Sequence, residues 1–570
     1  MAESTSSAPA KKGASFSFAA FVKLAIAVIA AVVCLYLPYE SMGLVGAHAI
    51  NAVEIRVIAI FVFAALLWIL EPFPIWTTSM LVIVTMLLTV SDLGLKLTLP
   101  DFLGGNTLFS FQTDPATTEK FTNLVNYKGI MATFADPIIM LFLGGFFLAA
   151  AATKYKLDMN LARFLLKPFG TNPKFVLLGL MSITAFFSMF MSNTATAAMM
   201  LAILAPVLSL FDENDRGRAA FALAIPIAAN VGGMGTPIGT PPNAIALKAL
   251  GDMDATVSFG TWMAFGVPYV IILILLSWLL LLWLFPISKK KMELNVGGEF
   301  LKTPKAIVVY VTFAVTVLLW VLGKGVVGID SNMVAMIPMA VFAVTQVITK
   351  KDLNGMSWDV LWLVAGGFAL GLGLQKTGLA EHLIGAIPFD TWPALGLMVG
   401  AGTICLFMAN FMSHTATASL LVPIIAVVGV NVGGSLDNLG GVVALLVSVA
   451  FASSLGMSLP ISTPPNALAH ATGLVDTRGM AKTGIIIGIL GMVLTYAMMI
   501  FLANVGVFTP IEAKGTVHGV GPEKVAMLAP EEVKVKEEDG KAETVSAPLV
   551  DVFAPGSVEK DQDKQDAKKK

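Results

Sequence analysis

Two short polar motifs occur twice, almost letter for letter, in a chain that is otherwise largely apolar. The triplet Ser-Asn-Thr at 192–194 returns as Ser-His-Thr at 413–415, and both triplets precede Ala-Thr-Ala. The sequence Thr-Pro-Pro-Asn-Ala stands at 240–244 and again at 463–467. None of these stretches contains Asp, Glu, Lys or Arg, so their chemistry is that of hydroxyls, amides and backbone groups.

Helix breaks with this chemistry can bind ions of both signs. The N-terminus of a half-helix presents unpaired N–H groups and a partial positive charge, which suit a carboxylate or another oxyanion. The C-terminus of a half-helix and an unwound loop present carbonyl oxygens, which suit a small hard cation. Four breaks in two pairs predict one shared site near the middle of a membrane, where an anion and its coupling ion bind together.

The elements that must hold these breaks are predicted to be membrane-spanning helices. The chain has 570 residues, 56% of them hydrophobic and only 13% charged, whereas soluble proteins are about 25% charged. Many apolar runs approach or exceed the roughly 20 residues that cross a bilayer, namely 18–37, 52–70, 74–90, 261–285, 305–323 and 483–503. The first run lacks a cleavage site and is expected to be a retained helix.

Three landmarks show that the chain is an internal duplication. The first landmark, Gly-Gly-Phe at 144–146, returns at 366–368. The other two are the polar motifs, and all three landmarks are separated from their copies by about 220 residues. Each half is predicted to make five crossings, and an odd number inverts the second half relative to the first. The predicted fold is an all-α polytopic membrane protein with about 11 transmembrane helices and two re-entrant hairpins in two inverted repeats.

The predicted domain boundaries follow from this duplication. They are an N-terminal arm with the first transmembrane helix at 1–51, a first repeat at 52–286 with a hairpin at 175–209 and a broken helix at 219–250, a basic cytoplasmic loop at 287–304, a second repeat at 305–507 with a hairpin at 396–430 and a broken helix at 441–473, and a disordered polar tail at 508–570.

The basic residues predict the orientation of the chain in the membrane. With the N-terminus in the cytoplasm, most Lys and Arg residues between the spans lie inside, as the positive-inside rule requires. Eleven crossings then place the C-terminal tail outside. Short loops and the absence of a targeting signal favour a bacterial inner membrane, although a eukaryotic membrane stays open. The net charge of −1 says nothing about partners, and no nucleic-acid partner is expected.

Structural interpretations and other functions compete with an ion site. A single Ser or Thr in a membrane helix often bonds only its own turn, and the Gly-Gly-Phe pairs are expected to be packing glycines. An intramembrane enzyme would need a nucleophile with a base or a metal cluster, and the five histidines form no metal-binding spacing, although a pair of His414 and His470 is conceivable. Cys34 and Cys405 both lie in apolar runs, so no disulfide is expected. A channel would need a continuous pore lining, which duplicated hairpins do not favour.

The paired triplets and Thr-Pro-Pro-Asn loops in two inverted halves resemble the divalent anion:sodium symporter family of sodium/dicarboxylate and sodium/sulfate carriers. The resemblance covers about residues 50–507. It implies a sodium-coupled secondary transporter of small dicarboxylates such as succinate, malate or fumarate, and no enzyme. It also implies a homodimer in membrane lipid with an elevator-type movement, and sodium as the coupling ion without any further cofactor.

Carried over by residue, the resemblance assigns both the anion site and the cation sites. The anion site would be lined by Ser192, Asn193, Thr194, Thr240, Pro241, Ser413, His414, Thr415, Thr463 and Pro464. The first sodium site would use Ser188, Asn193 and Gly239. The second cation site would lie near Ala409, His414 and Ser462.

His414 is where this chain departs from the family, which has Asn at that position. An imidazole nitrogen is a poor ligand for sodium, which prefers oxygen. Three outcomes stay open: fewer sodium ions per cycle, proton-linked transport, or sodium-independent exchange of one dicarboxylate for another. A simple hydrogen bond from His414 to a carbonyl is also open. Sulfate, citrate, tartrate and sulfonated carboxylates fit the same chemistry as succinate, so the cargo is not fixed by the sequence.

Overall fold

The computed structural model describes residues 18–39, 50–98, 107–114, 119–208, 211–212, 215–292, 300–380, 382 and 392–507, which all belong to one unit, Met1–Glu512. The predicted N-terminal arm before Phe18 and the predicted tail at 508–570 lie outside the described residues.

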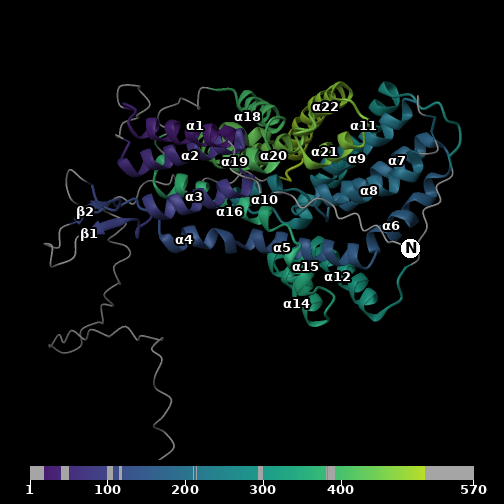
Figure 1. The fold of residues 1–570 in the computed structure, drawn as a ribbon, viewed down its shortest axis with the longest axis horizontal. Helices are drawn as coiled ribbons and strands as arrows, with labels where there is room; N and C mark the ends of the chain where they lie inside the picture. Colours follow the sequence, from purple (N-terminus) through teal and green to yellow (C-terminus); the bar gives the residue numbers. More distant parts are fainter. Residues whose placement is uncertain are drawn as a thin grey trace, which may run out of the picture. The chain divides into compact units, whose positions relative to one another are not determined.

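The first half of the chain begins with α1 and contains both long apolar helices and shorter helix segments (Figure 1). Its elements are α1 (Phe18–Leu35), α2 (Ala52–Leu70), α3 (Ile75–Thr89), β1 (Lys96–Thr98), β2 (Thr107–Ser110), α4 (Tyr127–Ala132), η2 (Thr133–Ala135), α5 (Pro137–Lys154), α6 (Leu157–Leu166), η3 (Lys167–Phe169), α7 (Pro173–Ser188), α8 (Asn193–Leu208), α9 (Gly217–Gly233), α10 (Pro241–Gly251) and α11 (Phe259–Leu284).

The second half follows the same order of long and broken helices. Its elements are α12 (Pro304–Val327), α13 (Ser331–Val334), α14 (Met336–Val344), α15 (Lys350–Asn354), α16 (Trp358–Lys376), α18 (Ala394–Ala409), α19 (His414–Val432), η5 (Gly433–Leu439), α20 (Gly441–Ser454), α21 (Pro464–Ala471) and α22 (Thr477–Asn504).

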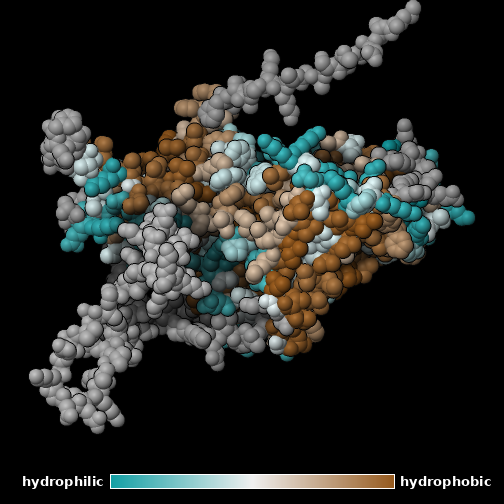
Figure 2. Space-filling view, turned by 90° about the horizontal axis from the view of Figure 1, so that it is seen from below, coloured by the Kyte–Doolittle hydropathy of each residue, from teal (hydrophilic) through white to brown (hydrophobic). Residues whose placement is uncertain are grey.

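The prediction of an all-α membrane protein is confirmed. In the described part of the chain, seven helical segments are long and apolar enough to cross a membrane, and several shorter apolar helices accompany them. Large hydrophobic side chains are exposed along α1, α12 and α22, and Figure 2 shows broad hydrophobic areas on one face of the molecule. Such exposed apolar area is typical of a surface that contacts lipid.

One small element was not predicted from the sequence. Between α3 and α4, strands β1 and β2 pair in an antiparallel two-stranded sheet, with Lys96 opposite Ser110. Both strands are largely exposed, so alternation of buried and exposed residues gives no signal in the sequence.

The two halves repeat the same helix contacts. The helix α3 packs against α16, and α14 packs against α5; likewise α7 and α8 pack against α9, as α18 and α19 pack against α20. Each broken helix also crosses to the other half, since α10 packs against α19 and α21 packs against α8. This exchange of equivalent partners is what a duplicated chain with a shared centre requires.

Gly-Gly-Phe is a packing motif at two equivalent helix crossings, as expected. A Cβ atom on Gly144 would lie 2.4 Å from the carbonyl oxygen of Ala335, where α5 meets α14. A Cβ atom on Gly366 would lie 2.4 Å from the Cβ atom of Ser79, where α16 meets α3. Only glycine allows these backbones to approach so closely.

Candidate functional site

The polar triplets lie at the turns of two helical hairpins. In the first hairpin α7 ends at Ser188 and α8 begins at Asn193, and the hydroxyl of Ser192 accepts a hydrogen bond from the Ala195 amide at 3.2 Å. In the second hairpin α18 ends at Ala409 and α19 begins at His414. The sequence therefore placed both helix breaks correctly.

Oxygen atoms converge beside the turn of the first hairpin. The Ser188 hydroxyl lies 2.7 Å from the carbonyl oxygen of Ala229 and 2.7 Å from Oδ1 of Asn193. The carbonyl oxygens of Ala229 and Gly239 also lie beside the Asn193 amide. The hydrogen bonds of the amide are satisfied when its nitrogen lies on this side, where it donates to the Ser188 hydroxyl at 2.7 Å and to the Ala229 and Gly239 carbonyls at 3.2 Å each. We call Ser188, Asn193, Ala229 and Gly239 the first oxygen cluster.

Two glycines make this cluster possible. A Cβ atom on Gly239 would lie 2.4 Å from the carbonyl oxygen of Gly233 and 2.9 Å from that of Ser188. A Cβ atom on Gly233 would lie 2.7 Å from Oδ1 of Asn193. The loop between α9 and α10 can therefore present its carbonyls to Asn193 only because these positions carry no side chain.

The asparagine of each Thr-Pro-Pro-Asn motif holds its own loop in place. Nδ2 of Asn243 donates to the carbonyls of Gly233 and Thr236 at 3.0 and 2.8 Å. Nδ2 of Asn466 donates in the equivalent way to the carbonyls of Met457 and Leu459 at 2.7 and 3.0 Å. In both motifs the prolines occupy the first turn of the half-helix, where a missing N–H costs nothing.

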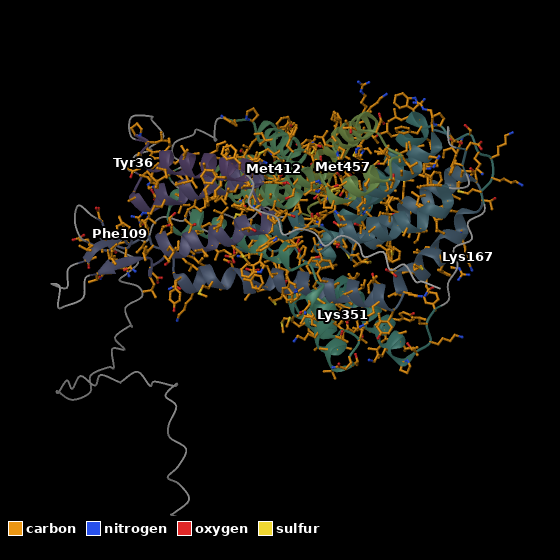
Figure 3. All side chains as sticks on the ribbon, in the orientation of Figure 1. Tyr36, Phe109, Lys167, Lys351, Met412 and Met457 are labelled. Atoms are coloured by element: carbon orange, nitrogen blue, oxygen red, sulfur yellow. The ribbon has the colours of Figure 1, made fainter. Side chains whose placement is uncertain are left out.

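The second hairpin has a different set of contacts. Nε2 of His414 lies 2.8 Å from the carbonyl oxygen of Gly456, so the imidazole and this carbonyl share a hydrogen bond. The hydroxyl of Ser462 donates to the carbonyl of Asn410 at 2.8 Å. The predicted ligand Ala409 packs closely on Gly456, because a Cβ atom added to Gly456 would lie 2.4 Å from the Cβ atom of Ala409. Met412 and Met457, labelled in Figure 3, are the sequence neighbours of Ser413 and Gly456.

The structure brings some of the predicted site residues together and leaves others apart. Ser188, Asn193 and Gly239 are brought together in one cluster. His414 and Ala409 both meet Gly456, whereas Ser462 bonds Asn410 instead. The other anion-site candidates lie at the starts of four helices, and these helices contact one another across the two halves. In the first half the candidates are Ser192, Thr194, Thr240 and Pro241, and in the second half they are Ser413, Thr415, Thr463 and Pro464.

Four asparagines at this centre were not named as site residues from the sequence. Asn230 in α9 is fully buried and donates from Nδ2 to Oγ1 of Thr463 at 3.2 Å and to Oδ1 of Asn466 at 3.3 Å. Asn410 accepts from the Ser458 amide at 2.8 Å. The Asn that both copies of Thr-Pro-Pro-Asn share was the available signal for Asn243 and Asn466, and a lone Asn in an apolar helix was the signal for Asn230.

Metal-ligating side chains do not cluster in the described part of this centre, although His414 belongs to it. Over the described ranges, no group of three or more His, Cys, Asp or Glu residues is arranged to hold a metal ion. His470, which the sequence suggested as a partner of His414, bonds the carbonyl of Val475 through Nδ1 at 2.9 Å. Any cation bound here would be held by carbonyl, amide and hydroxyl oxygens.

Apolar spanning helices around paired helix breaks with a polar centre define an integral membrane protein of the transporter class. Residues 65–440 match the citrate transporter family (CitMHS), and the chain belongs to this family.

Relatives with assigned names support the same class. An uncharacterized transporter of Haemophilus influenzae is 35% identical, over 66% of this chain and 83% of the relative. The sodium-dependent dicarboxylate transporter SdcS of Staphylococcus saprophyticus is 31% identical, over 67% of this chain and 79% of the relative. The inorganic phosphate transporter PHO87 of Saccharomyces cerevisiae is 29% identical, over 76% of this chain and 45% of the relative. The resemblance to sodium/dicarboxylate carriers is confirmed at the level of the family.

Proposed function

We propose that this protein is a secondary transporter that carries a small dicarboxylate together with sodium. The observation that carries the proposal is the first oxygen cluster, in which the Ser188 hydroxyl and the carbonyl oxygens of Ala229 and Gly239 converge on the Asn193 amide. Oxygen atoms that converge in this way repel one another unless a cation or a donor lies between them. A small hard cation such as sodium prefers such carbonyl, amide and hydroxyl ligands.

The Asn193 amide can act as the sensor of that cation. Without sodium, its nitrogen can turn toward the carbonyls of Ala229 and Gly239 and donate to both. With sodium, its oxygen turns inward and its nitrogen is released toward the neighbouring triplet. Sodium binding then presents an N–H donor at the place where the anion is proposed to bind, which couples the two ligands.

The anion is proposed to bind between the four helix starts. Asn193 and Thr194 begin α8, Thr415 lies in the first turn of α19, and Thr240 and Thr463 precede α10 and α21. Helix N-termini and hydroxyls can hold a carboxylate without a fixed cationic side chain. A dicarboxylate is the preferred cargo because SdcS is named for it, and citrate, sulfate and phosphate are the alternatives.

Exchange without sodium is the second candidate, and His414 favours it. The carbonyl of Gly456 is engaged by Nε2 of His414 at 2.8 Å, so this carbonyl is not available to a second cation in the same arrangement. We therefore propose that the imidazole replaces the second cation. In sodium symport, the preferred function, the first cluster then provides the sodium coupling by itself, whereas in exchange neither site would bind a coupling ion.

The remaining features of the proposal come from the family resemblance and the sequence. They are eleven crossings with two re-entrant hairpins, a cytoplasmic N-terminus, an outer C-terminal tail, a homodimer, an elevator movement and a bacterial inner membrane. The hairpin helices α7 and α8 have 16 residues each and would reach only about 24 Å, less than the roughly 30 Å of a hydrocarbon core. This length supports a re-entrant course.

Uptake of radiolabelled succinate into proteoliposomes tests the function. We expect concentrative uptake when an inward sodium gradient is present and little uptake without it. Uptake that ignores sodium but requires unlabelled succinate inside would establish exchange instead. Uptake of citrate, sulfate or phosphate with no uptake of succinate would reject the dicarboxylate assignment, and a conductance without saturation would reject a carrier.

A further inference from the structure

Asn230 forms the polar link between the helix α9 of the first half and the broken helix of the second. Its side chain is fully buried in a helix whose other residues around it are apolar. A buried amide in such surroundings costs free energy unless it is hydrogen-bonded. Its Nδ2 is hydrogen-bonded only across the centre of the molecule, to Thr463 at 3.2 Å and to Asn466 at 3.3 Å, and its Oδ1 has no partner among the described residues.

This link determines which hydrogen-bonding capacity of Thr463 is left for a ligand. The Thr463 oxygen accepts from Nδ2 of Asn230 and, as the N-cap of α21, from the amide of Asn466 at 3.2 Å. A hydroxyl has two acceptor lone pairs and one O–H donor. With both lone pairs engaged, only the O–H remains, and a group that can only donate suits an anion rather than a cation.

We propose that Asn230 is a positioning residue that fixes the Thr463 hydroxyl as a hydrogen-bond donor toward a carboxylate of the cargo. The inference rests on the proposed function and deepens it, because it names a residue that sets the preference of this site for an anion. Asn230 itself does not touch the cargo in this proposal; it acts through Thr463.

The first half of the molecule lacks the equivalent link, which gives an internal comparison. Thr240, the counterpart of Thr463, makes no side-chain capping bond to α10. Ser453 in α20 stands at the place equivalent to Asn230, and its hydroxyl donates to the carbonyl of Val449 in its own helix at 2.8 Å. The two halves therefore contribute unequally, and Thr463 is expected to contribute more to anion affinity than Thr240.

The substitution Asn230→Asp tests directly whether the Thr463 hydroxyl acts as a donor toward the cargo, because it keeps the shape of the side chain at position 230. A carboxylate can only accept, so the Thr463 O–H would turn toward Asp and away from the cargo. We expect the dissociation constant for succinate at pH 7.5 and saturating sodium to rise about 10- to 100-fold. Sodium binding in the absence of succinate is measured by the sodium-induced shift in melting temperature. Its dissociation constant is expected to stay within about twofold of the wild-type value, because the first oxygen cluster is unchanged.

Lowering the pH supplies a signature that a merely structural role would not give. Protonation of the new carboxyl group restores an O–H donor near Thr463, so the ratio of variant to wild-type dissociation constants is expected to fall as the pH is lowered from 8 to 5.5. Taking the ratio removes the effect of protonating succinate itself. A ratio that does not change with pH, together with a loss of sodium binding, would show that Asn230 only maintains the fold and would overturn the proposal.

A double-mutant cycle with Thr463→Val and a matched control complete the experiment. If Asn230 acts through Thr463, the variant carrying both exchanges is expected to bind succinate no more weakly than Thr463→Val alone, whereas additive losses would overturn the proposal. Ser453→Ala is expected to leave affinity within about twofold. If Asn230→Asp does not fold, Asn230→Ser takes its place in the cycle.

Wild-type protein that binds none of succinate, citrate, sulfate or phosphate would reject the proposed function, and with it this inference. If the wild type binds one of these anions and Asn230→Asp binds it equally well, the inference about Asn230 is rejected while the proposed function stands.

Discussion

Ser188 and Ala409 end equivalent helices of the two hairpins, yet only Ser188 has a hydroxyl. Asn193 and His414 begin the next helices, and only Asn193 has an amide oxygen. Two differences at matched positions therefore leave the first half with two side-chain oxygens that the second half lacks. Among the described residues, the Ser188 hydroxyl and the Asn193 amide have no equivalent at Ala409 and His414.

Ser188→Ala is expected to weaken sodium binding at the first oxygen cluster. The hydroxyl lies 2.7 Å from both the Ala229 carbonyl and Asn193 Oδ1, so its loss removes one oxygen from the cluster. We expect the sodium concentration for half-maximal succinate uptake to rise about 10-fold, which corresponds to about 1.4 kcal/mol. Thr184→Val, one turn earlier in α7, is the control, because the Thr184 hydroxyl donates only to the Leu180 carbonyl. Equal effects of both exchanges would contradict a sodium-specific role.

His414→Asn is expected to restore an oxygen ligand in the second hairpin. The exchange removes the imidazole from the Gly456 carbonyl and introduces an amide oxygen in its place. We expect sodium dependence of succinate uptake to become steeper, as measured by the Hill coefficient in proteoliposomes. His470→Asn is the control, since His470 bonds only the nearby Val475 carbonyl among its described contacts. An unchanged sodium dependence in His414→Asn would show that the imidazole does not replace a cation ligand.

At the scale of the elements, close helix crossings hold the broken helices in position. The helix α16 crosses α3 at Gly366 and meets α19 at Gly367, where a Cβ atom would lie 2.6 Å from that of Ser419. The helix α19 begins at His414, so α16 links α3 directly to the second hairpin. Small residues at these crossings are required because bulkier ones would separate the backbones.

Gly366→Ala is expected to destabilise the bundle. The new Cβ would lie 2.4 Å from the Ser79 Cβ, and overpacking of this kind costs about 1–3 kcal/mol. Thermal unfolding in detergent should therefore show a lower melting temperature than in the wild type. Gly400→Ala in α18 is the matched control, because nothing lies within 4 Å of its Cβ position, and the better helix propensity of Ala should leave stability equal or slightly higher. A melting temperature for Gly366→Ala at or above that of the wild type would contradict the crossing.

At the scale of the whole molecule, an ion pair joins the two halves outside the spanning segments. Nζ of Lys154, at the end of α5, donates to the Val347 carbonyl and to Oδ2 of Asp352 in α15, at 2.8 and 2.6 Å. Partial burial alone would raise the pKa of Asp352, but hydrogen bonds from Lys154 and Thr349 lower it to about 2. Because the folded pKa is depressed, the stabilisation is present above the unfolded pKa of about 3.9 and is lost as pH falls toward 2.

The exchange Asp352→Asn tests this ion pair through its pH dependence. We expect the variant to melt at a lower temperature than the wild type at pH 6, and the difference to shrink as pH falls from about 4 toward 2, where Asp352 becomes protonated. The measurement is the melting temperature in an acid-tolerant detergent across this range. Lys351→Gln, in the same helix and labelled in Figure 3, is the control, and it should differ little from the wild type at any pH. A difference for Asp352→Asn that is constant across the range would exclude the ion pair as its cause.

The sequence alone determined the class of the protein, the duplication and the helix breaks. Apolar runs of spanning length can be satisfied only as helices in lipid, since every backbone group must be paired internally. The prolines at 241–242 and 464–465 and the two polar triplets then predicted where half-helices begin, because proline lacks an N–H and is tolerated in the first turn of a helix but not in its interior. The expectation that Gly-Gly-Phe packs helices followed from the same local rules.

Only the tertiary structure decided which polar residues meet. Asn230 is separated from Thr463 by more than 200 residues and carries no repeated motif, so no local pattern could pair them. The choice of Gly456 as the partner of His414 likewise depends on how α19 packs against α20. Local sequence sets where a helix begins and which groups it exposes, whereas hydrogen bonds between distant segments depend on the packing of whole helices, which a single stretch of sequence does not encode.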